Sequence, residues 1–595
     1  MKRNRTMAVI AAGAVLTMGA AACSSSKAKT PSNGSGSGGG KASQGAYNAG
    51  VGKVFNASDQ KGGTLRFANS GDWDSLDPAD TYYGFSWNFI RNYGRSLTVF
   101  KSAPGSGGAV VVPDLAESLG KPSDNAKTWT YKIRKGVKFE DGSVVTSKDV
   151  KYAVERSLDK TVFPDGPTYF NDFLDLQGYT TPYKDTDPNK LGLKAIETPD
   201  DQTIIFHLKK PFSGFDYFAQ LPSTMPVPRA KDNGSKYKQH VVSTGPYMFQ
   251  TNNLGKNFTM VRNPNYDPAT DPDSGRKPLV EKMEVALNVN SDDIDSRLLA
   301  GDLDVSIEGT GVGAATQGKV LSDPAIKAKA DSAANARLWF TVLNTDVAPL
   351  DNVHCRKAVL YAADKTGYQR AYGGSVGGDI ATNLMPPLIP GFKKIDLYEA
   401  TSKPDGDTTK AKNELKQCGQ PSGFSTNISY RVERPKEKAT AEALQASLAR
   451  VGIKLTIKGY PKGDYAALYA GKPDYSKANK LGLKIYGWGA DWPDGFGFLD
   501  QIVDSRIIRP TGGNTNLGIK VPAADALLDK ALQTTEKTAR EKIWGQIDQV
   551  VMENASVLPG IWSKGLLYRP PNLTNVFVND AFGMYDYTVL GTNKK

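Results

Sequence analysis

The sequence predicts an α/β protein that is divided into two or more lobes. Its 595 residues exceed what a single hydrophobic core normally organises. Residues 427–432 have the pattern of a strand, and residues 436–451 have that of a helix closed by Gly452. Residues 453–457 then read as a second strand. A strand, helix and strand of these lengths predict a right-handed crossover in a parallel sheet, which is typical of α/β folds.

The composition is that of an ordinary globular protein, with 39% hydrophobic and 23% charged residues. The formal net charge is +12, but the basic residues are interleaved with acidic ones and do not form a cluster. A dispersed charge of this kind predicts a solvated surface with a mild attraction to anionic cell envelopes. It argues against nucleic-acid binding, which needs a concentrated basic face.

A targeting segment precedes the fold. Residues 2–5 are rich in Lys and Arg, and the apolar run at 7–22 is shorter than the roughly 20 residues that span a bilayer. The run ends in Ala20-Ala-Ala-Cys23, which resembles a bacterial lipobox except that Ala20 stands where Leu is usual. We expect residues 1–22 to be a cleaved signal peptide and Cys23 to be acylated, which anchors the protein on the outer face of the bacterial cell membrane. An ordinary signal with an incidental cysteine is the alternative.

A low-complexity stretch follows the cysteine. Residues 24–60 consist largely of Ser, Gly, Lys, Ala and Asn, with too few apolar side chains to form a core. We therefore expect residues 23–60 to be a flexible tether with a root-mean-square reach of about 30–36 Å.

The remaining cysteines are Cys355 and Cys418. In an exported protein an even number of cysteines favours a disulfide, and two free thiols are the alternative. The three histidines are far apart in the sequence, so no histidine-based metal site is expected. Residues 309–314 mimic the Gly-x-Gly-x-x-Ala pattern of a dinucleotide site. Such cofactors are scarce outside the cell, so we expect a loop there and no cofactor.

The clearest local structure lies between residues 129 and 154. Trp129, Tyr131 and Ile133 alternate with polar residues, which predicts a half-buried strand. Thr146 is expected to cap the helix that follows, with Asp149 three residues later as its capping-box partner. This stretch therefore reads as a strand, a turn and a capped helix.

The same stretch closely resembles the signature of family 5 extracellular solute-binding proteins, the peptide- and nickel-type receptors of ABC importers. The resemblance rests on residues 129–143 (WTYKIRKGVKFEDGS) and 146–154 (TSKDVKYAV). Further fragments match the family in the same order, so the resemblance extends from about residue 62 to the C-terminus. They are residues 75–79, 112–118, 243–247, 261–266, 344–345, 351–359 and 362–365.

The resemblance implies a two-lobed, periplasmic-binding-protein-like α/β fold with a subdomain inserted in the first lobe. Two crossovers, near residues 337–344 and 556–563, are expected to connect the lobes. The expected division is lobe I at 61–100, 196–336 and 557–595, the inserted subdomain at 101–195, and lobe II at 337–556.

One loop has the composition of a ligand site. A strand at 484–488 breaks into glycines and a proline, and Asp491 and Asp494 lie in that break beside Trp488 and Trp492. In open α/β sheets ligands bind beyond the carboxyl ends of the strands. One acid between aromatic rings suits a ligand with a cation and variable apolar groups. Core packing and turn chemistry are the alternatives, and Asp494 is expected to be a turn or surface residue.

The resemblance gives this loop a role. In the family's peptide receptors an Asp that follows a Trp-x-Ala motif pairs with the α-ammonium of the peptide. The motif here is Trp488-Gly489-Ala490, so Asp491 is the expected ammonium partner and Trp488 the expected wall of the site. The segment at Tyr83 and Gly84 is where the family offers backbone groups to an extended peptide. The expected ligand-binding residues are Asp491, Trp488, Tyr83, Gly84 and Trp492.

We therefore expect a monomeric receptor that captures an oligopeptide and delivers it to an ABC permease. An oligosaccharide or another small solute is the alternative ligand, because the aromatic rings could stack on sugars. A secreted glycosidase that uses Asp491 and Asp494 is the alternative function. It is disfavoured because paired catalytic acids normally come from different strands, and no nucleophile motif accompanies them. No catalytic residue is expected.

Overall fold

The computed structural model describes residues 46–432, 434–461 and 464–594. All of them belong to one compact unit, Gln44–Lys595. The predicted signal peptide and Cys23 lie outside the described residues. None of the helices formed by the described residues combines the length and the apolar character that a membrane span requires.

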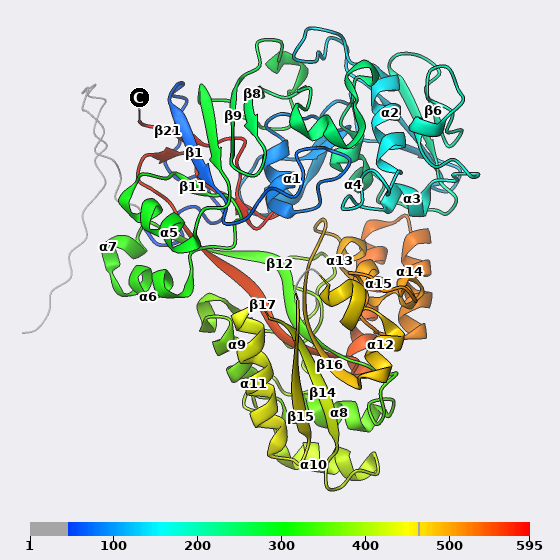
Figure 1. The fold of residues 1–595 in the computed structure, drawn as a ribbon, viewed down its shortest axis with the longest axis vertical. Coiled ribbons are helices and arrows are strands. Elements are labelled where there is room, and N and C mark those ends of the chain that lie inside the picture. Colours follow the sequence, from blue (N-terminus) through cyan, green and yellow to red (C-terminus); the bar gives the residue numbers. More distant parts are fainter. Residues whose placement is uncertain (1–45, 433, 462–463, 595) are drawn as a thin grey trace, which may run out of the picture. The chain divides into compact units, whose positions relative to one another are not determined.

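A five-stranded sheet forms the centre of lobe I (Figure 1). Its order is β11-β1-β10-β9-β8, in which β1 is parallel to β10 and β11 while β8, β9 and β10 are antiparallel. Leu65 and Phe67 of β1 are buried and fix the inner face of the sheet. The elements of this lobe are β1 (Thr64–Ala68), α1 (Gly84–Ile90), β2 (Thr98–Phe100), β3 (Val111–Pro113), β8 (Tyr247–Asn253), β9 (Asn257–Arg262), β10 (Lys282–Ala286), α5 (Ser291–Ala300), β11 (Val305–Ser306), α6 (Ala314–Ser322) and α7 (Pro324–Lys327).

A four-stranded sheet of order β4-β5-β7-β6 forms the inserted subdomain. The predicted strand at Trp129 is β5, and Thr146 and Asp149 form the predicted capping box at the start of α2. The predicted end of the insertion at residue 195 is wrong, because β7 pairs with β5 along its whole length. The elements are β4 (Lys121–Ser123), β5 (Thr128–Lys132), α2 (Ser147–Ser157), α3 (Tyr169–Phe173), β6 (Ile196–Glu197), β7 (Thr203–His207) and α4 (Asp216–Ala219).

A six-stranded sheet of order β13-β17-β12-β16-β14-β15 forms the centre of lobe II. Strands β14 and β15 are parallel and are joined by α11, which confirms the predicted crossover. The elements are β12 (Ala330–Leu343), α8 (Val353–Ala362), α9 (Lys365–Ala371), β13 (Gly378–Ile380), α10 (Thr408–Gln417), β14 (Ser425–Arg431), α11 (Pro435–Ala449), β15 (Lys454–Tyr460), α12 (Pro473–Ala478), β16 (Leu481–Gly489), α13 (Gly495–Val503), α14 (Pro522–Gln533), α15 (Lys537–Glu553) and β17 (Val557–Tyr568).

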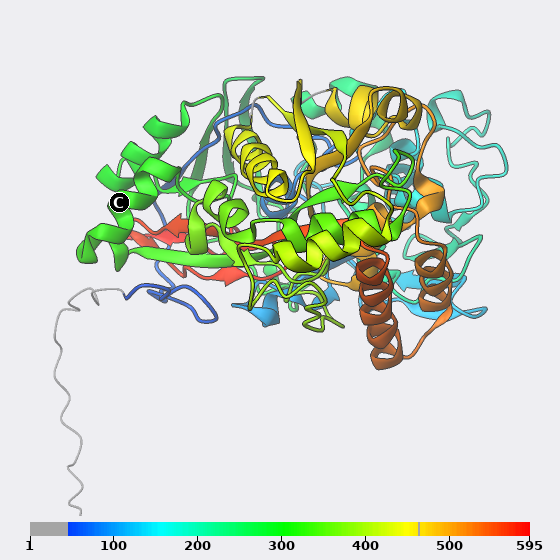
Figure 2. The ribbon, with the colours of Figure 1, turned by 90° about the horizontal axis from the view of Figure 1, so that it is seen from below.

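The two longest strands of this sheet, β12 and β17, connect the lobes. They run antiparallel from the pair Ala330–Tyr568 to the pair Val342–Val557, and Figure 2 shows them in green and red. One end of each strand packs in a small core with residues of lobe I, and the other end packs in the core of lobe II. Both strands pass through the segments predicted to be crossovers.

The segment from Ala46 to Gln60 packs on the body, so the structure differs here from the predicted tether. The Asn48 N–H donates to the Ala330 carbonyl, and the Gly50 N–H donates to Asp331 Oδ1 at 2.9 Å. Phe55 bridges to Val576 and lies under the Arg569 guanidinium. The composition of the segment is polar, but its asparagines bond to the body: Asn48 Oδ1 accepts from the Ser332 N–H of β12, and the Asn56 side chain donates to the Leu573 carbonyl.

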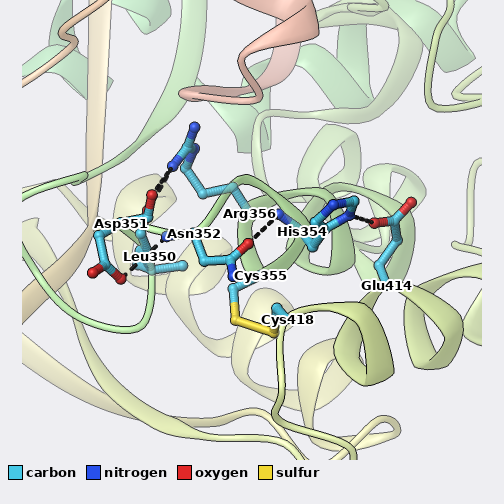
Figure 3. The surroundings of a disulfide bond; sticks show 8 residues. All are labelled: Leu350, Asp351, Asn352, His354, Cys355, Arg356, Glu414 and Cys418. Carbon is cyan, nitrogen blue, oxygen red and sulfur yellow. Dashed lines mark hydrogen bonds and ion pairs between the residues drawn. A yellow bond between two sulfur atoms is a disulfide. The ribbon is translucent and has the colours of Figure 1, made fainter.

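Cys355 and Cys418 form a disulfide that joins α8 to the end of α10, with the two Cα atoms 5.4 Å apart (Figure 3). His354 Nδ1 lies 2.7 Å from Glu414 Oε2 across the same two helices. Both links tie an outer layer of lobe II together.

Candidate ligand-binding site

The loop between β16 and α13 is fixed by its own backbone. The Asp491 N–H donates to the Gly497 carbonyl at 3.0 Å. Asp494 caps α13, since its Oδ1 accepts from the Phe496 N–H at 2.9 Å. The turn chemistry predicted for Asp494 is therefore present, but the surface position is wrong, because the residue is 8% exposed. The cap leaves Asp491 as the acid of the loop that can face the other lobe.

The Asp491 carboxylate meets two tyrosines from the other side of the molecule. The Tyr82 hydroxyl donates to Asp491 Oδ2 at 2.9 Å, and the Tyr169 hydroxyl donates to the same oxygen. Tyr82 lies just before α1 in lobe I, and Tyr169 is the first residue of α3 in the inserted subdomain. One carboxylate of lobe II thus contacts both other parts of the fold.

Burial raises the pKa of Asp491 to about 6. The hydrogen bonds from Tyr169 and Tyr82, and the charge of Arg337, act in the opposite direction. Burial and the charge of Asp491 hold the pKa values of both phenols well above their ordinary range. At neutral pH the site therefore holds an ionised acid and two protonated hydroxyl donors.

A cationic group lies on the same lobe as Asp491. The guanidinium groups of Arg337 and Arg434 lie 5.6 and 5.4 Å from the centre of the Trp339 ring. Burial, and then the charges of Arg434 and Arg431, lower the pKa of Arg337 to about 10, so it remains a cation at neutral pH. Only burial and neighbouring charges act on Arg337, and none of the described residues accepts a hydrogen bond from its side chain. Sequence reasoning missed this group, because its members come from β12 and from the start of α11.

The predicted wall residues differ in their surroundings. Trp488 is 9% exposed, and its indole N–H has no acceptor among the described residues. Trp492 is fully buried between Tyr169, at 4.8 Å between ring centres, and Tyr217, which stacks on it at 5.8 Å. The prediction that Trp492 contacts a ligand is therefore not supported by this arrangement, since its ring packs lobe II against the inserted subdomain.

The Tyr83 segment is held by an acid that sequence reasoning did not assign. Asp74 accepts from the Tyr82 N–H at 2.6 Å, the Tyr83 N–H at 3.2 Å and the Ser86 hydroxyl at 2.6 Å. The Tyr83 side chain is 53% exposed, and Gly84 begins α1. Asp74 was visible in the sequence next to Trp73, but nothing in its spacing indicated that it would cap this turn.

Two α/β lobes joined by two long strands are the architecture of a solute-binding protein. The family model for bacterial extracellular solute-binding proteins, family 5 (middle), matches residues 110–508. The chain belongs to this family, whose members are solute-binding transport proteins. Within the described residues, no group of three or more His, Cys, Asp or Glu side chains could hold a metal ion.

Known proteins resemble the chain over most of its length. It is 28% identical over 533 residues to heme-binding protein A of Haemophilus influenzae, covering 86% of this chain and 89% of that protein. It is 26% identical over 507 residues to the probable D,D-dipeptide-binding periplasmic protein DdpA of Escherichia coli K12, covering 83% and 87%. A solved structure titled clavulanic acid biosynthesis oligopeptide binding protein 2 superposes with a TM-score of 0.89 at 41% identity, covering 93% of this chain and 99% of that chain. The predicted two-lobed fold is therefore confirmed.

Proposed function

We propose that this protein is the substrate-binding lipoprotein of an ABC importer, which captures an oligopeptide between its lobes and delivers it to a membrane permease. The observation that carries the proposal is the Asp491 carboxylate, an acid held where lobe II meets lobe I and the inserted subdomain. Relatives named as dipeptide- and oligopeptide-binding proteins support a peptide ligand, and the relative named as heme-binding protein A keeps another small solute as the alternative.

Asp491 is the proposed partner of the peptide's α-ammonium. An ammonium taken out of water needs an acceptor, and a carboxylate provides charge-assisted hydrogen bonds. Asp491 Oδ1 accepts from none of the described residues, so it is available to a ligand donor. The indole N–H of Trp488, on the strand that leads to Asp491, has no acceptor among the described residues and could donate to a ligand carbonyl.

Arg337 and Arg434 are the proposed partners of an acidic group on the ligand, such as the carboxylate of a peptide. Guanidinium groups bind carboxylates through paired, parallel hydrogen bonds. Arg434 Nε lies 3.8 Å from Glu437 Oε1, whereas Arg337 forms no ion pair with any of the described residues, so a ligand anion would chiefly offset the charge of Arg337. The backbone at Tyr83 and Gly84 is proposed to pair with the extended peptide between its two ends.

Calorimetric titration of one tetrapeptide in three forms tests this proposal. The unmodified peptide should bind most tightly, and its N-acetylated and C-amidated forms should each bind about tenfold or more weakly, since each loses a charged hydrogen-bonding group. Equal affinities for the unmodified and acetylated forms would contradict the amine contact. Binding of a neutral oligosaccharide panel in place of peptides would favour the alternative ligand class. The peptide should be recovered intact, because no catalysis is proposed.

A lipid anchor at Cys23 is also part of the proposed function. An acylated Cys23 would hold a monomer on the outer face of the cell membrane, close to its permease. Membrane fractionation tests this directly. The unaltered protein should sediment with membranes and Cys23→Ser should appear in the soluble fraction, whereas equal partitioning of both would contradict lipid anchoring.

A further inference from the structure

The two phenols that reach Asp491 bond to the same oxygen. Tyr82 and Tyr169 both donate to Oδ2, and none of the described residues donates to Oδ1. A carboxylate offers about four lone-pair positions, about two on each oxygen, so two donors occupy nearly all the acceptor positions of Oδ2. Oδ2 of Asp491 is therefore occupied by the two phenols, whereas Oδ1 can accept a hydrogen bond from a ligand.

Neither phenol is free to turn away. The Tyr82 ring stacks on Trp87 at 5.6 Å with an interplanar angle of 20°. The Tyr169 ring lies 4.8 Å from Trp492 and 5.2 Å from Phe218. Both hydroxyls stay protonated at neutral pH, because burial raises their pKa values. Oδ2 is thus held by two fixed donors across the physiological pH range.

We infer that Tyr82 and Tyr169 determine the specificity of the site, in that they admit a ligand's ammonium group and disfavour a guanidinium group at Asp491. This inference rests on the proposed function, and it names the class of cation that the same carboxylate accepts. The two tyrosines would act by occupying Oδ2, not by touching the ligand.

The geometry of the two cations explains the selection. A guanidinium forms its strong pair with a carboxylate through two parallel N–H donors, one to each oxygen. With Oδ2 already bonded to two phenols, the second of those hydrogen bonds has no acceptor position. An ammonium is a compact charge with three donors, so it can bond to Oδ1 alone. Occupation of Oδ2 should therefore weaken the binding of a guanidinium ligand more than the binding of an ammonium ligand.

A matched peptide pair tests the inference. One tetrapeptide would be prepared with a free N-terminal amine and with the same nitrogen converted to a guanidine, and both would be titrated by calorimetry. The unaltered protein should prefer the amine by about tenfold or more, the effect of one charged hydrogen bond. In the double variant Tyr82→Phe/Tyr169→Phe that preference should fall to about threefold or less, chiefly because the guanidinylated peptide binds more tightly than it does to the unaltered protein.

The pH dependence of binding gives a second readout, which loss of packing alone would not produce. The ionisable groups around Asp491 are Tyr82, Tyr169 and Arg337, with Asp500 acting on both phenols. Both phenols favour the ionised carboxylate, so their removal should raise the pH at which binding of the amine peptide is half lost. An unmoved midpoint together with an unchanged preference would overturn the inference.

Two further variants separate the possible failures. Tyr266→Phe removes a comparable hydrogen bond, from a half-buried phenol to Asp271 Oδ2 at 2.8 Å, and should leave the preference unchanged. Asp491→Asn should weaken binding of the amine peptide. If Asp491→Asn has no effect, the proposed function itself fails. If it weakens binding while the double tyrosine variant keeps the full preference, only the role of the tyrosines fails.

Discussion

Arg156 of α2 and Asp77 of lobe I form a buried bidentate ion pair, with nitrogen–oxygen distances of 2.6 and 2.8 Å. Asp232 contacts the same guanidinium at 3.1 Å. Asp77 lies on the segment that leads to Tyr82, so the pair fixes the inserted subdomain to the loop that reaches the site. It joins two parts of the fold that each supply one phenol to Asp491.

Replacing Arg156 by Met should lower the free energy of unfolding by about 3–5 kcal/mol, because Asp77 would remain buried without a cation. Urea unfolding followed by circular dichroism measures this change. Lys148→Met is a matched control, since Lys148 pairs with Asp201 on the surface and little change is expected there. Equal effects of the two substitutions would contradict a structural role for the buried pair.

Peptide affinity should fall as the pH is lowered through about 6, the pKa of Asp491. Above that pH the carboxylate is ionised and attracts an ammonium, and below it the neutral acid does not. Calorimetry between about pH 5 and pH 8 should therefore give tighter binding at the higher pH. The N-acetylated peptide should vary less over the same range, and a flat profile for the amine peptide would contradict the charge pairing.

Asp500 of α13 should reduce stability at neutral pH. It is 9% exposed, and burial followed by the charge of Asp504 raises its pKa from 3.8 to about 7, while Lys210 and Gln501 act in the opposite direction. An acid with a raised folded-state pKa costs stability once the unfolded chain ionises, so the cost grows between about pH 4 and pH 7. Asp500→Asn should stabilise the protein by about 1–3 kcal/mol at pH 8 and change little near pH 4. An equal increase in the free energy of unfolding at both pH values would show that the ionisation of Asp500 is not the cause of the stabilisation.

The disulfide should contribute about 4 kcal/mol to the free energy of unfolding, because Cys355 and Cys418 close a loop with a sequence separation of 63. The double variant Cys355→Ala/Cys418→Ala should lose that amount. Treatment of the unaltered protein with a reductant should have a similar effect, and it should not affect the variant. A double variant as stable as the unaltered protein would contradict this contribution of the disulfide to the free energy of unfolding.

Local patterns predicted the elements, and contacts between distant segments decided the site. The β14–α11–β15 crossover and the capping box at Thr146 depend on residues a few positions apart, so sequence periodicity and spacing indicated both. The contact of Tyr169 with Asp491 spans 322 positions, and no local pattern can indicate it. The glycine-rich mimic of a dinucleotide site is explained by packing, since a side chain at Gly311 would collide with the backbone of Leu566.

The aromatic residues of the loop illustrate the same limit. Trp488 and Trp492 are similar in sequence context, and neither indole N–H has an acceptor among the described residues, yet only Trp488 keeps some exposure. Trp492 is covered by rings from the inserted subdomain, which lie more than 250 residues earlier in the chain. Composition can indicate an aromatic loop, but the surface of the inserted subdomain that packs on the loop determines which ring is buried.

The affinity of Asp491→Asn for an unmodified peptide tests the central claim most directly. Asp494→Asn is the matched control, because asparagine preserves a helix N-cap and the substitution removes an acid three residues away. We predict that calorimetry will find binding weakened about tenfold or more in Asp491→Asn and unchanged in Asp494→Asn. Equal affinity of Asp491→Asn and the unaltered protein would contradict the account.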